Sequence, residues 1–144
     1  AENTGAPDRL ASMMSFALNA SRQQRVLFPM HPRTKKSLES SGIRIDSRFL
    51  VVEPLSYFDI LVALKNSSLA LTDSGGLQKE AYWLGVPCVT LREETEWIET
   101  IESGWNILFR QFDGEHNLTA SRRTHYGDGR AAERIITLLS SAFS

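Results

Sequence analysis

The chain has 144 residues, a hydrophobic fraction of 42% and a formal net charge of -1 at pH 7, and Cys88 is its single cysteine. This length allows one domain with its own core, and the near-neutral charge excludes a nucleic acid or a membrane surface attracted by bulk charge. One thiol excludes an internal disulfide and a cysteine-based zinc site, which favours a reducing compartment such as the cytoplasm.

Apolar periodicity, capping residues and turn residues predict helices and strands in alternation. The predicted elements are, in chain order, a helix over 10–18, a strand over 25–30, a helix over 33–42, a strand over 48–52, a helix over 56–65, a strand over 68–72, a helix over 75–84, a strand over 87–91, a helix over 95–104, a strand over 106–109 and a last helix over 132–143. This order predicts an α/β fold, a Rossmann-like three-layer sandwich in which helices cover both faces of a parallel sheet. We expect residues 111–126 to form a surface loop that brings the last helix back to the sheet.

The segment TDSGG (72–76) lies where a predicted strand becomes a helix. Ligands of parallel sheets bind beyond the carboxyl ends of strands, and the first turn of a helix offers unpaired N–H groups and the positive end of its dipole. Gly75 and Gly76 would let an anion approach the backbone, and Ser74 could donate its hydroxyl. We therefore expect a phosphate or diphosphate here. Alternatively, Ser74 is an ordinary N-cap and the glycines merely turn the chain.

Glu80 follows Gly76 by four residues, near the start of the same predicted helix. Its carboxylate could reach a ribose diol once a diphosphate occupies the helix start; the alternative is a solvated surface residue. The pattern is neither a Walker loop, since no Lys-Ser/Thr follows the glycines, nor a GxGxxG fingerprint.

Longer motifs resemble a known family. The segments TDSGGLQKEA, GVPCVTLREETEWIE and YGDGRAAERI, with FPMHPRT and AENT, occur in this chain in the order found in the C-terminal domain of the non-hydrolysing UDP-N-acetylglucosamine 2-epimerases. The resemblance covers essentially the whole chain. It implies that residues 1–144 are the UDP-binding C-terminal Rossmann-like domain of a glycosyltransferase-B-like architecture, cut from a longer polypeptide whose N-terminal catalytic half is absent.

The resemblance also implies a set of substrate-binding residues. They are Ser74, Gly75, Gly76, Glu80, Arg92, Thr95, Tyr57 and Ile60. Within this set, the Ser-Gly-Gly segment would hold the diphosphate, Glu80 the ribose, and main-chain groups over 57–60 the uracil ring. Arg92 and Thr95 would lie near the same cleft.

The family reaction inverts C2 of the sugar by elimination of UDP to a glycal and re-addition of UDP, and the resemblance implies neither a metal nor a nicotinamide cofactor. The carboxylates that move the proton belong to the N-terminal domain, so no catalytic residue is assigned to this chain. The implied partners are a UDP-sugar, the N-terminal domain and, for the full-length protein, a second copy in a homodimer. The chain departs from many bacterial members at Trp97, where they carry an arginine.

Three further features have competing interpretations. His31 matches a histidine that lines a regulatory UDP-sugar site in some members, or it is a strand-end histidine bonded to backbone. The stripe Trp97, Ile101 and Trp105 is interpreted as core packing at helical spacing, and 127–129 as a turn into the last helix.

Two other functions stay open. One is the donor domain of a glycosyltransferase of the same architecture, and the other is a non-catalytic nucleotide-sugar sensor. A C2 epimer formed by the full-length protein without an acceptor would distinguish the epimerase from both.

Overall fold

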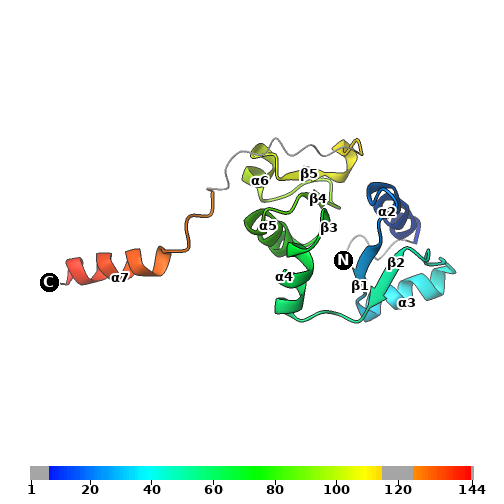
Figure 1. The fold of residues 1–144 in the computed structure, drawn as a ribbon, viewed down its shortest axis with the longest axis horizontal. Helices are drawn as coiled ribbons and strands as arrows, with labels where there is room; N and C mark the ends of the chain where they lie inside the picture. Colours follow the sequence, from blue (N-terminus) through cyan, green and yellow to red (C-terminus); the bar gives the residue numbers. More distant parts are fainter. Residues whose placement is uncertain (1–6, 115–124, 144) are drawn as a thin grey trace.

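A computed structural model describes residues 7–114 and 125–143, in which helices and strands alternate as predicted (Figure 1). The elements are α2 (Pro7–Ala20), β1 (Val26–Pro29), α3 (Pro32–Ser41), β2 (Phe49–Val52), α4 (Tyr57–Lys65), β3 (Ala70–Thr72), α5 (Gly75–Leu84), β4 (Cys88–Thr90), α6 (Ile98–Glu102), β5 (Asn106–Leu108), the 3-10 helix η1 (Phe109–Gln111) and α7 (Ala131–Ala142). None of the helices in these described ranges is long and apolar enough to cross a membrane.

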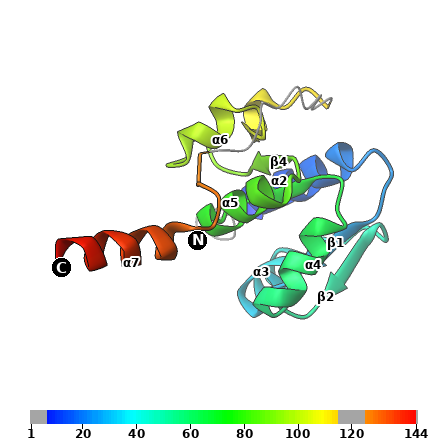
Figure 2. The ribbon, with the colours of Figure 1, turned by 60° about the vertical axis from the view of Figure 1, so that its left-hand side comes forward.

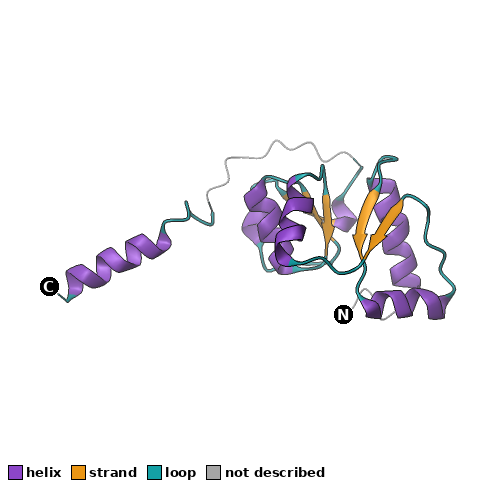
Figure 3. Cartoon of the chain, turned by 60° about the horizontal axis from the view of Figure 1, so that its bottom comes forward, coloured by secondary structure: helices purple, strands orange, loops and turns teal. Residues whose placement is uncertain are grey.

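The strands pair in parallel, as predicted, but they form two ladders instead of one continuous sheet. β1 pairs with β2, and β3, β4 and β5 pair in that order. The two sheets lie side by side (Figure 3). A hydrogen bond from Ser68 Oγ to Gln24 Oε1, at 2.9 Å, joins the segments that precede β3 and β1.

Helices cover both faces of β3. Consecutive side chains of a strand point to opposite faces, so neighbouring residues of β3 pack against different helices. Leu71 packs against a first apolar cluster, which contains Leu10, Met14, Ala17, Met30, Leu38 and Phe49. Ala70 belongs to a second cluster, together with Leu64, Ala81, Val86 and Cys88. The first cluster is built by α2 and α3 and the second by α4 and α5, so the predicted layers of helices are present.

Local capping chemistry fixes where the helices begin and end. Ser56 Oγ accepts a hydrogen bond from the N–H of Asp59 at 3.3 Å and begins α4. Gly42 ends α3 with φ 64° and Gly85 ends α5 with φ 72°. This left-handed conformation costs a residue with a Cβ free energy, which explains glycine at both positions.

The helix predicted over 95–104 is shorter in the structure, where α6 has five residues. Before it, the backbone N–H of Trp97 donates to Thr95 Oγ1 at 3.2 Å. This side chain holds the chain in a turn, and the helix therefore starts at Ile98. Trp97 and Trp105 lie outside α6, so the interpretation of a stripe at helical spacing is wrong.

The last predicted helix forms, but it does not return to the sheet. α7 points away from the rest of the described chain (Figures 1 and 2), and its described side chains are exposed. Its apolar face needs a partner surface, and residues 7–114 do not provide one. The expectation of a returning helix is therefore wrong, and residues 115–124 of the predicted loop lie outside the described residues.

Candidate functional site

Ser74 precedes α5 and lies two residues after Thr72, the carboxyl end of β3. The N–H of Ser74 donates to Thr72 Oγ1 at 3.0 Å, and Ser74 Oγ accepts from the N–H of Leu77 at 3.4 Å. The N–H of Gln78 donates to the carbonyl of Ser74 at 3.2 Å. Ser74 is therefore the N-cap, and the two N–H groups that follow it have no intrahelical acceptor because they lie in the first turn.

The two glycines of this turn have different surroundings. A Cβ on Gly75 would lie 2.7 Å from Glu96 Oε1 and 2.8 Å from Trp97 Nε1. A Cβ on Gly76 would meet, among the described atoms within 4 Å, Ser74 Oγ at 3.8 Å. Close packing of the loop before α6 therefore explains Gly75, whereas the exposed backbone that an anion can approach is at Gly76.

The loop between β4 and α6 carries two of the predicted site residues to the start of α5. Thr95 Oγ1 donates to Gln78 Oε1 at 2.6 Å. Arg92 Nη1 donates to Glu96 Oε2 at 3.0 Å, and the other oxygen of this carboxylate faces Gly75. The structure therefore brings Arg92 and Thr95 together with the Ser-Gly-Gly segment.

A buried polar network holds this loop, α5 and β5 together. Asn106 Nδ2 donates to Gln78 Oε1 and to Thr100 Oγ1, each at 3.2 Å, and Thr90 Oγ1 donates to Asn106 Oδ1 at 2.9 Å. These side chains are buried, Gln78 completely so. Hydrogen bonds in a low-dielectric interior are directional and costly to lose, so the network fixes the geometry of the candidate site.

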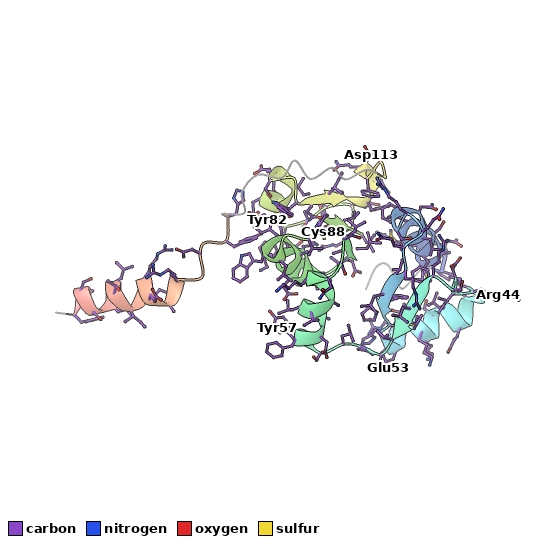
Figure 4. All side chains as sticks on the ribbon, viewed as in Figure 1. Arg44, Glu53, Tyr57, Tyr82, Cys88 and Asp113 are labelled. Carbon is purple, nitrogen blue, oxygen red and sulfur yellow. The ribbon has the colours of Figure 1, made fainter. Side chains whose placement is uncertain are left out.

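Of the two predicted residues of α4, Ile60 lies on the side of α5 and Tyr57 is exposed. The side chain of Ile60 packs against the second apolar cluster, as does Leu77 of α5. The N–H of Ile60 donates to the carbonyl of Ser56 at 3.0 Å. Main-chain donors for a ligand are therefore restricted to Tyr57 and Phe58, in the first turn of α4. The side chain of Tyr57 points away from the sheets (Figure 4).

Glu80 is half-buried on α5, on the turn after the glycines. Its position agrees with the predicted spacing from Gly76. His31, in contrast, follows β1 in the other sheet, and its Nδ1 accepts from the N–H of Arg33 at 3.2 Å. The geometry of His31 is that of an N-cap bonded to backbone, which favours the structural interpretation of this residue.

The chain offers no reactive thiol at this site. Burial raises the pKa of Cys88 to about 12, so the thiol is protonated at neutral pH. Within the described ranges, no group of three or more His, Cys, Asp or Glu side chains is arranged to hold a metal ion. The chemistry that the described residues offer is hydrogen bonding and charge, directed at the start of α5.

Sequence reasoning missed Gln78 and the position of Trp97. Gln78 lies four residues after Ser74, so a helical prediction already placed both on one face, and this spacing was the available signal. Lys79 Nζ lies 3.8 Å from the centroid of the Trp97 ring. That contact depends on the turn at Thr95, which the helical prediction over 95–104 excluded.

Known proteins with similar sequences point to one family. Residues 1–140 match the family model described as UDP-N-acetylglucosamine 2-epimerase. A UDP-2,3-diacetamido-2,3-dideoxy-D-glucuronate 2-epimerase of Pseudomonas aeruginosa is 39% identical over 151 residues, and a UDP-N-acetylglucosamine 2-epimerase of Methanocaldococcus jannaschii is 34% identical over 154 residues. Each alignment covers 97% of this chain and 42% of the relative, so the chain spans less than half the length of these relatives.

Solved structures agree with this assignment. A structure of the UDP-GlcNAc 2-epimerase from Methanocaldococcus jannaschii gives a TM-score of 0.81 at 33% identity, over 97% of this chain and 43% of that chain. A complex of the Methanocaldococcus jannaschii enzyme with UDP-GlcNAc and UDP gives a TM-score of 0.76 at 33% identity, over 97% and 42% of the two chains. The predicted fold class is confirmed, and the chain belongs to the UDP-N-acetylglucosamine 2-epimerase family.

Proposed function

We propose that residues 1–144 form the UDP-binding C-terminal domain of a UDP-sugar 2-epimerase. The observation that carries the proposal is the start of α5, where two glycine N–H groups lie in the first turn and the backbone of Gly76 is open. Family membership supports it, as does the similar structure that holds UDP-GlcNAc and UDP. An anion at the start of a helix gains from both the N–H groups and the dipole.

Each candidate residue has a role in this proposal. Ser74, Gly75 and Gly76 hold the diphosphate, and Glu80 accepts hydrogen bonds from the ribose. Main-chain groups at the start of α4 meet the uracil ring. Arg92 and Thr95 border the same cleft, with Arg92 supplying positive charge when it is released from Glu96.

The proposed reaction is an elimination followed by an addition. A base removes the proton from C2, the C1–O bond breaks, and its electron pair leaves with UDP; C2 then regains a proton on the opposite face while UDP oxygen reattaches at C1. The donors at α5 meet the negative charge that develops on the leaving diphosphate. The groups that move the proton lie outside this chain, in the catalytic half of the longer protein.

The proposed substrate is a UDP-linked 2-acetamido sugar. The names of the two relatives, one acting on UDP-N-acetylglucosamine and one on a UDP-diacetamido-glucuronate, share this chemistry. The proposal further includes a homodimeric full-length protein working in the cytoplasm, which the reduced, buried thiol of Cys88 fits.

Calorimetry of the 144-residue chain with UDP tests the binding half of the proposal. We expect weak binding, with a Kd of about a millimolar or below, and no binding of uridine, which lacks the diphosphate. Absence of UDP binding at several millimolar would overturn it.

Product analysis of the full-length protein with UDP-N-acetylglucosamine tests the activity. A C2 epimer formed without an acceptor supports the epimerase. A glycoside formed with an acceptor alone supports a glycosyltransferase, and binding without turnover supports a sensor.

A further inference from the structure

His125 and Tyr126 pack against the body of the molecule, although α7 begins only a few residues later. The N–H of His125 donates to Tyr82 Oη at 3.4 Å. The ring of Tyr126 meets the ring of Tyr82 edge-on, with centroids 5.3 Å apart, and the ring of Trp97 edge-on at 6.4 Å. Tyr82 is 1% exposed. The chain is therefore anchored to the interior up to Tyr126.

The residues from Asp128 onward form a second unit that is held together by its own side chains. Asp128 Oδ1 accepts from the N–H of Arg130 at 3.1 Å, and its Oδ2 accepts from Arg134 Nη2 at 2.8 Å. Arg130 Nε donates to Glu133 Oε2 at 2.8 Å. These bonds join the turn at 128–130 to the first turns of α7. The turn and the helix are therefore expected to move together.

Gly127 is the link between these two units. Its φ is 77°, and a Cβ on it would meet no atom of the described residues within 4 Å. Glycine reaches more of backbone conformational space than any other residue, and it does so here without steric contact. Gly129 also has a positive φ, of 81°, but it lies inside the turn that Asp128 closes by its bond to Arg130. The freely rotating position is therefore Gly127.

The surroundings of α7 do not fix its direction. Its large apolar side chains are between 53% exposed, at Leu139, and 86% exposed, at Phe143. Figure 2 shows the helix pointing away from the sheets and from the helices that cover them. Packing of an apolar face is what usually holds a helix in one orientation, and residues 7–114 do not supply that packing.

We propose that α7 turns about Gly127 as a rigid arm, with Tyr126 as the anchor of the arm on the body. The anchor lies against Tyr82 of α5 and against Trp97, which directly precedes α6. The base of the arm is thus fixed to the part of the molecule that carries the candidate site, while the helix changes direction. This inference goes beyond the proposed function and does not depend on it.

Backbone ¹⁵N relaxation of the unchanged 144-residue chain tests the proposal, because it reports motion on the picosecond-to-nanosecond timescale. We expect the amides of His125 and Tyr126 to share the rotational correlation time of residues 7–114. The amides of residues 131–142 should share a shorter one, with helical Cα shifts. A single correlation time for body and helix, a change that falls before His125, or random-coil shifts over α7 would overturn the proposal.

Tyr126→Ala removes the anchor and keeps the arm. We expect the position at which the correlation time changes to move from Gly127 to before His125, while the Cα shifts of α7 stay helical. Phe143→Ala is the control, because it also removes an aromatic ring, one that is 86% exposed, and it should leave the change at Gly127. If the change stays at Gly127 in Tyr126→Ala, Tyr126 is not the anchor.

Gly127→Ala tests the link. Alanine has fewer backbone conformations than glycine and is strained at positive φ. The correlation time of residues 131–142 should therefore rise toward that of the body. Gly129→Ala is the matched variant, since it introduces the same methyl group at a similar φ but leaves Gly127 unchanged, and the shorter correlation time of α7 should persist. Equal effects of the two substitutions would overturn the assignment of Gly127 as the link.

Discussion

Each of the two sheets has a junction at which a strand is followed by a helix, β1–α3 in the first and β3–α5 in the second. The two junctions differ in the N–H groups that they offer to a ligand. At the first, α3 begins with Pro32, which has no N–H, and the N–H of Arg33 donates to His31 Nδ1. At the second, α5 begins with two glycines whose N–H groups lie in the first turn, and a single hydroxyl caps the helix. At the first junction proline removes one first-turn donor and His31 binds another, whereas at the second the N–H groups of both glycines lie in the first turn without an intrahelical acceptor.

The cores behind the two junctions differ in the same sense. The α3 side is supported by an apolar cluster that includes Leu38 and Phe49. The α5 side has, in addition to its apolar cluster, the buried polar network around Gln78 and Asn106. Apolar contacts stabilise without fixing direction, whereas hydrogen bonds fix the orientation of the groups they join. The region around α5 therefore holds its polar groups in a fixed geometry, which the region around α3 does not need.

Of the variants, Leu38→Ala in the apolar cluster behind α3 should lower the stability most. Leu38 is 2% exposed, and Leu38→Ala should lower the free energy of unfolding by about 2–5 kcal/mol, because it removes buried methyl groups and leaves a cavity. Urea denaturation measures this. UDP affinity, measured where the variant is still folded, should not change. A loss of affinity would contradict the proposal that UDP is held at the start of α5 and not near α3.

Asn106→Ala tests the buried polar network around Gln78 and Asn106. It leaves Thr90 Oγ1 and Gln78 Oε1 short of a partner in the interior, and we expect a loss of about 1–3 kcal/mol in the free energy of unfolding. Unlike Leu38→Ala, it should also weaken UDP binding, because the loop that carries Thr95 loses its support. Asn66→Ala, at an exposed asparagine that bonds to the carbonyl of Val62, is the control and should leave UDP binding as it is.

A pair of glycine variants separates binding from stability. Gly76→Ala places a Cβ where the anion approaches but meets little protein, so UDP affinity should fall about tenfold or more while the melting temperature stays the same or rises. Gly42→Ala, at φ 64°, should cost about 1 kcal/mol of stability and leave UDP affinity alone. Calorimetry and thermal unfolding measure both, and an opposite result for either variant would contradict the assignment of the glycines.

His31→Ala should have a smaller effect. Loss of its cap on α3 should lower the free energy of unfolding by about 0.5–1 kcal/mol. UDP binding should stay within error, because His31 lies beside α3 in the other sheet and makes no contact with the start of α5 in the proposed site. A marked drop in UDP affinity would revive the regulatory interpretation of His31.

The smallest effect at neutral pH is expected from Cys88, in β4 behind the candidate site. Burial raises the pKa of this thiol to about 12 from an ordinary value of 9.0, so the stability that burial favours is present below pH 9 and is lost as the pH rises toward 12. At pH 8 a thiol reagent should label the folded chain slowly and the urea-unfolded chain at once. Rapid labelling of the folded chain would show that the α5 half opens easily.

Local signals predicted most of the fold. Ser56, Ser74, Gly42 and Gly85 begin or end helices as their residue types indicate. The turn at Thr95 was missed because the segment has the composition of a helix, and a single side-chain hydrogen bond to the N–H of Trp97 decides against it.

Contacts between distant segments could not be predicted from one sequence. The bond from Asn106 to Gln78 joins residues 28 positions apart, and no periodicity encodes it. The last helix was predicted and forms as α7, but its amphipathic pattern does not say which surface covers the apolar face. The glycine turn was predictable because its chemistry is contained in consecutive residues.

The most direct test of the central claim is a titration of the ¹⁵N-labelled chain with UDP, followed at the backbone amides of the two junctions. We expect the amide resonances of Gly75 and Gly76 to shift and saturate together, while those of Arg33 and Thr34 at the start of α3 stay in place. Shifts at α3 with none at the glycines, or no saturable shift at either junction, would contradict it.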